Sequence, residues 1–89
     1  MKFIEAMHLY KSKDGGLYIR NNKKYFWIIP ENLEKENIYQ GDIVLALCKN
    51  TKARVLVLNI FLSENKKLKH KHKKVTKVLD KMIKNNLFI

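Results

Sequence analysis

A run of closely spaced lysines is the clearest candidate for chemistry in this chain. Residues 66–74 read Lys-Lys-Leu-Lys-His-Lys-His-Lys-Lys. Ammonium groups at this spacing can neutralise successive phosphates of a nucleic acid without reading its base sequence. A solvated loop that limits aggregation is the alternative interpretation. The side chains we expect to contact nucleic acid or a nucleoprotein are Lys66, Lys67, Lys69, His70, Lys71, His72, Lys73, Lys74 and Lys77.

Aromatic residues lie near basic ones earlier in the chain. An exposed ring on a β-sheet can stack on a base, which contributes roughly 1–3 kcal/mol per base. Tyr25 and Trp27 share one face of an expected strand, and Phe26 and Ile28 share the other. Because core packing is the commoner role of such rings, we expect Phe26 and Ile28 in the core. Tyr25, Trp27 and the nearby Arg20 then complete the expected nucleic-acid interface.

Metal binding and catalysis receive little support from the residue pattern. His70 and His72 would lie on one side of an extended backbone and could bind zinc if Cys48 or His8 approached. The ligand set is incomplete, however, and the surrounding lysines disfavour a dication. Cys48 lies in an apolar stretch, where a buried structural thiol is the usual role. We therefore expect no metal, no cofactor and no enzymatic activity.

Composition points to a small basic protein. The 89 residues hold 19 Lys and Arg against 8 Asp and Glu, for a net charge of +11, which attracts polyanions. Seventeen of the 19 are Lys, so an AT-rich coding sequence can account for part of the charge. A single cysteine excludes an intrachain disulfide and favours a reducing cytoplasm. Glu5 interrupts the apolar start that a signal peptide needs, and no apolar run is long enough to span a membrane.

Strands are expected to position these residues. Alternating apolar residues and turn signals predict strands over 2–10, 17–20 and 24–29, which would form a meander joined by the Asp-Gly-Gly of residues 14–16 and the turn at 21–23. Residues 30–37 predict a connection with one helical turn. Strands over 43–48 and 54–62 are expected to form a second hairpin. This hairpin is apolar on both faces, so one face needs a cover.

A C-terminal amphipathic helix is the expected cover. Its apolar positions, spaced i, i+3, i+4, i+7 and i+8, are Val75, Val78, Leu79, Met82 and Ile83. This spacing predicts a helix over 75–86, and a second subunit is the alternative cover. The apolar end Leu87, Phe88 and Ile89 predicts docking, either on the domain itself or on a partner. A homodimer is therefore an alternative.

These elements predict an α+β, mostly β, single domain over residues 1–89. Residues 1–62 would form a five-stranded antiparallel, partly open barrel of the SH3-like or OB-like kind, followed by a basic loop over 63–74, the helix and the tail. Gly-Asp-Ile-Val-Leu-Ala at 41–46 and Arg-Val-Leu-Val at 54–57 resemble a "Gly-Asp, strand, turn, strand" pattern in small barrel domains. The segment resembles short uncharacterised proteins of phages and Firmicutes. This resemblance implies a barrel and no catalytic residue.

Two functions follow from these patterns. The first is a non-enzymatic protein that binds nucleic acid or a nucleoprotein through the lysine-rich loop and the helix. The second is a phage or mobile-element module that binds and inhibits a host enzyme, for example in the manner of an anti-CRISPR protein. Membrane attachment is a weaker third interpretation, because the apolar stripe of the helix is expected to face the core.

Overall fold

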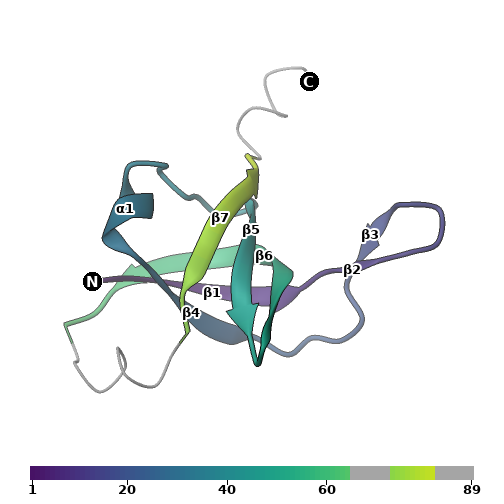
Figure 1. The fold of residues 1–89 in the computed structure, drawn as a ribbon. Coiled ribbons are helices and arrows are strands. Elements are labelled where there is room, and N and C mark those ends of the chain that lie inside the picture. The colour runs from purple at the N-terminus through teal and green to yellow at the C-terminus, as the bar shows by residue number, and fades with distance from the viewer. Residues whose placement is uncertain (65–72, 82–89) are drawn as a thin grey trace.

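The computed structural model describes residues 1–64 and 73–81, and this part of the chain is mostly β-structure (Figure 1). The elements are β1 (Lys2–His8), β2 (Tyr10–Lys11), β3 (Leu17–Tyr18), β4 (Tyr25–Ile29), α1 (Glu31–Glu34), β5 (Ile43–Cys48), β6 (Thr51–Leu62) and β7 (Val75–Asp80). The single helical turn expected within 30–37 is confirmed as α1. No helix in the described ranges is long and apolar enough to cross a membrane.

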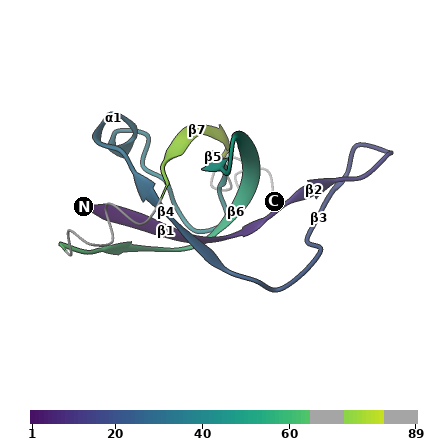
Figure 2. The same ribbon diagram turned by 60° about the horizontal axis from the view of Figure 1, so that its bottom comes forward.

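Five strands form one antiparallel sheet in the order β4-β1-β6-β5-β7. The expected five-stranded antiparallel sheet and the β5–β6 hairpin are therefore confirmed. Strand β6 is twelve residues long and serves two neighbours. It pairs with β5 over Thr51–Leu56 and with β1 over Val55–Leu62. This long strand lets the sheet curl, so that β7 lies across from β1 and β4 (Figure 2).

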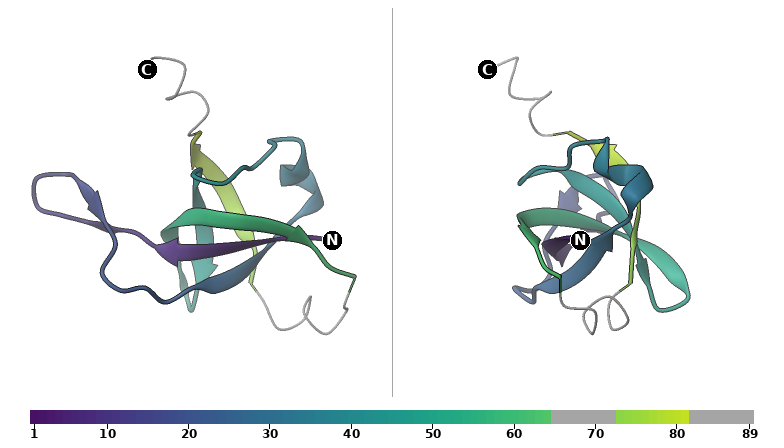
Figure 3. Two further views of the ribbon diagram at one scale, coloured as in Figure 1. Left: turned by 180° about the vertical axis from the view of Figure 1, so that it is seen from behind. Right: turned by 90° about the vertical axis from the view of Figure 1, so that its left-hand side faces the viewer.

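The expected N-terminal meander is wrong in its pairing. Strand β4 pairs directly with β1, from Lys2 opposite Ile29 to Ala6 opposite Tyr25. Strands β2 and β3 instead form a separate two-stranded ribbon, which extends from the end of the sheet opposite α1 (Figures 1 and 3). The turn expected at residues 14–16 is confirmed, since Gly15 has a φ of 91° at the tip of this ribbon. Turn residues place a hairpin, but they do not determine which strands continue into the main sheet.

The expected C-terminal helix is also wrong. Residues 75–80 form β7, an edge strand that pairs with β5. Val75 is buried and Val78 packs against the core, while two register shifts in the β5–β7 pairing offset the usual alternation. These shifts explain why the apolar spacing resembled a helix. The β-branched Val75, Thr76 and Val78 also suit a strand that completes the open edge of β5. The rest of the expected helix, 82–86, lies outside the described residues.

The core lies on the concave face of the curled sheet. Trp27 is 4% exposed and packs there with Ile29, whereas Phe26, on the other face, is 39% exposed and packs edge-on against Phe61. The expected face of Phe26 is therefore reversed, and Trp27 is buried instead of half-exposed. Ile28 is buried as expected, but on the convex face, where it pairs with Phe3. The other core residues are Ile4, Ala6, Leu33, Ile38, Val44, Ala46, Val55, Val57 and Val75.

Backbone contacts connect the two edges of the sheet. The Ile28 amide donates a hydrogen bond to the Lys73 carbonyl at 2.8 Å, and Ile28 forms an isolated parallel bridge with Lys74. The Leu47 amide donates to the Lys74 carbonyl at 3.0 Å. The segment that leads into β7 is thereby held between β4 and β5.

An ion pair fastens the other end of β7. Asp42 is fully buried, and its Oδ2 accepts hydrogen bonds from the Tyr39 amide at 2.8 Å and from the Lys81 ammonium at 2.6 Å. Lys81 also donates to the carbonyls of Glu36 and Asn37. The chain after β7 is thus tied to the loop before β5.

Candidate nucleic-acid interface

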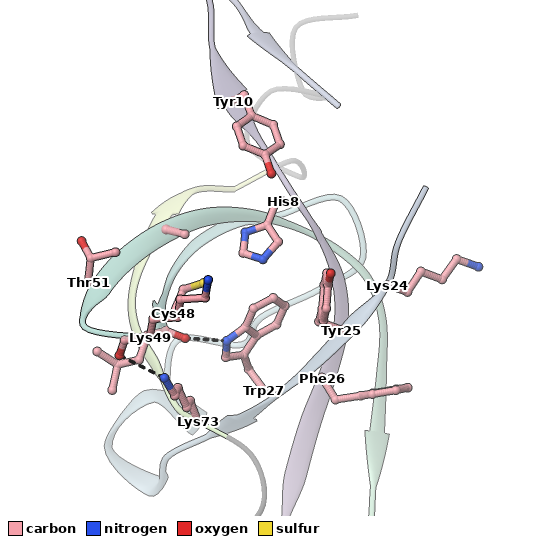
Figure 4. Close-up of a pocket in the computed structure, with 12 residues that line it drawn as sticks. His8, Tyr10, Lys24, Tyr25, Phe26, Trp27, Cys48, Lys49, Thr51 and Lys73 are labelled. Carbon is pink, nitrogen blue, oxygen red and sulfur yellow. Dashed lines mark hydrogen bonds between the residues drawn. The ribbon is translucent and has the colours of Figure 1, made fainter. Parts of the chain in front are cut away.

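A pocket of about 640 Å³ opens at the end of the concave face near the ribbon (Figure 4). Its floor is Trp27, where the apolar core ends. Residues of β1, β4, the β5–β6 hairpin and the segment before β7 form its walls. The lining residues are His8, Tyr10, Lys24, Tyr25, Phe26, Trp27, Leu47, Cys48, Lys49, Thr51, Ala53 and Lys73. The Phe26 side chain itself points away from the pocket and packs against Phe61 (Figure 4).

Three rings meet at the centre of the pocket. The His8 ring lies edge-on to both Tyr25 and Trp27, with centroid distances of 5.3 and 5.5 Å. The rings of Tyr25 and Trp27 are 6.1 Å apart. Pairing of Ala6 with Tyr25 brings the ends of β1 and β4 together, and alternation puts all three rings on the concave face. Because Tyr25 is 42% exposed, its ring is accessible to a ligand, whereas the Trp27 ring is largely covered.

Two hydrogen bonds fix the pocket walls (Figure 4). The Trp27 indole Nε1 donates to the Leu47 carbonyl at 2.8 Å, which links the floor to the end of β5. The Lys73 Nζ donates to the Lys49 carbonyl at 3.0 Å. A lysine ammonium has three N–H donors, so this bond to residue 49 uses one of the three on Lys73.

The charge around the pocket is of one sign. Lys24, Lys49 and Lys73 border it, and no described lining residue is acidic. Lys24 and Lys49 are exposed, so their ammonium groups reach solvent. Aromatic rings alone could attract a cation through their π-faces. Three nearby ammonium groups oppose that, and they favour an anionic ligand that carries a flat apolar group.

His8 is the titratable group at the pocket centre. Partial burial lowers the pKa of His8 from its ordinary value of 6.5. The imidazole is therefore mainly neutral near neutral pH, and it acts as a ring with one donor and one acceptor nitrogen. It can stack or hydrogen-bond without adding charge.

The structure brings together three of the residues predicted for the interface: Tyr25, Trp27 and Lys73. Arg20 lies outside the pocket, and its guanidinium is 4.6 Å from the Tyr10 ring centroid. Lys74 directly precedes β7 and Lys77 lies within it, and neither residue lines the pocket. The remaining predicted contacts, residues 66, 67 and 69–72 and the tail 87–89, lie outside the described residues.

The pocket residues that sequence reasoning missed include His8, Tyr10, Lys24 and Lys49. His8 and Tyr10 are two residues apart, as are Tyr25 and Trp27, and that shared spacing was the available signal. Lys49 could not be identified, because it reaches the pocket only through the β5–β6 turn. Cys48 and His8 both line the pocket, yet no three His, Cys, Asp or Glu side chains in residues 1–64 and 73–81 gather as a metal site.

Comparison with known proteins identifies a family. A family model described as a family of unknown function (DUF5839) matches residues 1–81, so the chain belongs to that family. No curated protein and no solved structure matches the chain.

Proposed function

We propose that this DUF5839 protein binds nucleic acid, with an unpaired base in the aromatic pocket and the adjacent phosphates on the lysines at its rim. In this arrangement the base stacks on Tyr25 above the Trp27 floor. Lys24, Lys49 and Lys73 contact the backbone on either side. The protein is non-enzymatic in this proposal, as the sequence predicts.

One observation carries the proposal: an accessible ring, Tyr25, lies in a pocket whose charged lining residues are all basic. Proteins that bind single strands without sequence preference combine aromatic platforms with a positive groove. An aromatic cage for a methylated ammonium would need acidic or neutral surroundings instead. The pocket lysines therefore separate these two ligand classes.

The sequence next to the pocket extends the same charge. Lys73 is the next-to-last residue of the lysine-rich run 66–74, and its backbone carbonyl accepts a hydrogen bond from the Ile28 amide at 2.8 Å. The run therefore joins the sheet at the pocket edge. In this proposal the lysines of the run contact phosphates that lead away from the bound base.

The position of the pocket is typical of a ligand site if the sheet is a partly open barrel. We infer this architecture from the curled sheet and from the backbone bridge between Ile28 and Lys74 at its two edges. The pocket then lies at the barrel mouth, where ligand sites of small barrels commonly occur.

Tyr25 and Phe26 provide a matched test. They are neighbours on β4 with similar exposure, 42% and 39%, but they lie on opposite faces. Binding of a labelled single-stranded oligonucleotide is followed by fluorescence anisotropy. Tyr25→Ala is expected to weaken binding roughly 5- to 150-fold, the equivalent of one lost stacking contact. Phe26→Ala is expected to leave the affinity within about twofold of the wild type.

Equal losses in the two variants, or none in either, would overturn the pocket assignment. Circular dichroism of both variants checks that the sheet is retained. Repeating the titration with RNA and DNA then decides which of the two the pocket prefers.

A protein-binding role is the second candidate, and a surface on the convex face favours it. Ile43, Leu45, Leu56 and Leu58 of the β5–β6 hairpin are only half-buried. Such residues could contact a host protein, as the inhibitor hypothesis requires. Leu56→Asp would then abolish capture of that protein, whereas nucleic-acid binding through the pocket would survive it.

A further inference from the structure

The geometry points to a second nucleic-acid contact: the β2–β3 ribbon lies in the major groove of a B-form DNA duplex, adjacent to the unpaired base in the pocket. This inference rests on the proposed function, and it specifies the ligand as DNA in which a duplex meets a single strand. The ribbon is the two-stranded arm that extends beyond the sheet (Figures 1 and 3).

The ribbon and its return segment carry a concentrated positive charge. Between Tyr10 and Lys24 there are five basic residues and one acid, a net charge of +4 in fifteen residues. All five are exposed. The basic residues are Lys11, Lys13, Arg20, Lys23 and Lys24. A projecting arm with this charge can approach phosphates that the curled sheet itself cannot reach.

The only acid in this segment is engaged within the tip. The Asp14 carboxylate accepts hydrogen bonds from the Ser12 hydroxyl and from the Gly16 amide. These two bonds lower the pKa of Asp14. The Ser12 amide also donates to the Gly16 carbonyl at 2.8 Å, which closes the turn. The tip is therefore an ordered loop on which Lys13 is the exposed cation.

The ribbon carries partly exposed apolar and aromatic side chains beside its charges, since Leu17, Tyr18 and Ile19 are 43%, 41% and 41% exposed. Tyr10 and Tyr18 lie 5.9 Å apart across the strand pair, and the Arg20 guanidinium covers the Tyr10 ring at 4.6 Å. The ribbon thus presents positive charge beside a partly exposed apolar surface, and apolar side chains in a major groove can contact thymine methyl groups. The major groove of B-form DNA, about 12 Å wide, admits a two-stranded ribbon, whereas the major groove of duplex RNA is too narrow for side chains to read.

The ribbon with its return segment shares two residues with the pocket. Tyr10 begins β2 and lines the pocket, and Lys24 ends the return segment and also lines it. A DNA strand that leaves a duplex on the ribbon would therefore enter the pocket without a gap. This continuity is the reason for a duplex with an overhang as the ligand.

The test compares a single-stranded oligonucleotide with the same strand as the overhang of a DNA duplex. The wild type is expected to bind the overhang duplex more tightly. Lys11→Ala with Lys13→Ala is expected to remove this preference, to reduce the salt slope on the overhang duplex by about two, and to leave single-strand binding unchanged. The matched control is Lys2→Ala with Lys35→Ala, which removes two cations outside the ribbon, at the start of β1 and directly after α1, and should retain the preference.

Three results would overturn the inference: no preference of the wild type for the overhang duplex, equal loss on both ligands in the ribbon variant, or equal binding to an RNA duplex with the same overhang. Failure of the proposed function has a different signature. In that case the wild type does not bind the single strand, or Tyr25→Ala binds it as well as the wild type.

Discussion

Trp27 and Leu47 are joined by a hydrogen bond of 2.8 Å from the indole Nε1 to the backbone carbonyl oxygen. Their strands, β4 and β5, are not neighbours in the sheet, since β1 and β6 lie between them. The bond therefore crosses the concave side of the curled sheet. It holds the pocket floor against the hairpin that forms the opposite wall.

Removing this bond is expected to destabilise the fold. Trp27→Phe keeps an aromatic ring but leaves the Leu47 carbonyl without its indole donor, which costs about 1–3 kcal/mol in the free energy of unfolding. Tyr25→Phe is the control. Because Tyr25 is 42% exposed, the free energy of unfolding of this variant should differ from that of the wild type by less than about 0.5 kcal/mol. Urea denaturation measures both variants. Equal stability of Trp27→Phe and the wild type would show that the bond contributes nothing.

The buried Asp42 carboxylate is expected to matter more to stability than any surface charge. Asp42→Ala leaves the Tyr39 amide without this acceptor, whereas the partly exposed Lys81 ammonium keeps the Glu36 and Asn37 carbonyls, so the loss should be about 1–3 kcal/mol. Asp42→Asn keeps an oxygen for the Tyr39 amide, so it should cost less. Urea denaturation of both variants gives the order, and an alanine variant more stable than the asparagine variant would contradict it.

Lys49 combines backbone strain with a place in the pocket. It is a non-glycine residue with a φ of 54° in the two-residue turn between β5 and β6. Asparagine tolerates this left-handed conformation better, so Lys49→Asn should raise stability by up to about 1 kcal/mol. The same change removes a rim cation, so it should weaken nucleic-acid binding.

Lys52→Asn, one residue after the start of β6, is the control for Lys49→Asn. Asparagine is unfavourable in a strand, so this variant should be less stable than the wild type. Thermal unfolding compares the two melting temperatures. A melting temperature of Lys49→Asn at or below that of Lys52→Asn would refute the strain interpretation.

Burial of His8 should make stability depend on pH in one direction. The unfolded chain binds a proton near the ordinary pKa of 6.5, whereas the folded chain binds it only at lower pH. The unfolded state therefore gains protons first, so the contribution of His8 is fully present above about pH 7 and is lost as the pH falls through the folded pKa. Urea denaturation at several pH values should show a smaller decrease for His8→Gln. A steeper decrease in the variant would reverse the sign.

Much of the sheet could be predicted from local sequence because its signals are local. The β5–β6 hairpin followed from two apolar runs around a short turn, and Gly15 marked the ribbon tip. The fate of Val75 and Val78 could not be predicted, because their spacing also fits a helix. This segment forms a strand because it pairs with the open edge of β5, which is a tertiary contact.

The pocket was only partly predictable for the same reason. Alternation correctly put Tyr25 and Trp27 on one face, but it could not tell which face of β4 is concave. That choice depends on the direction in which the sheet curls. Lys49 and Lys73 meet through a contact between residues 24 positions apart, which no local pattern encodes.

Trp27 is the only tryptophan of the chain and forms the pocket floor, so its fluorescence reports pocket occupancy directly. The decisive measurement titrates the protein with a single-stranded oligonucleotide and, separately, with inorganic polyphosphate, which has the charge but no bases. The proposed function predicts saturable quenching by the oligonucleotide, weakened steeply between about 50 and 200 mM salt, and little change with polyphosphate. Identical responses to the two polyanions, or no response to the oligonucleotide at low salt, would contradict base binding in this pocket.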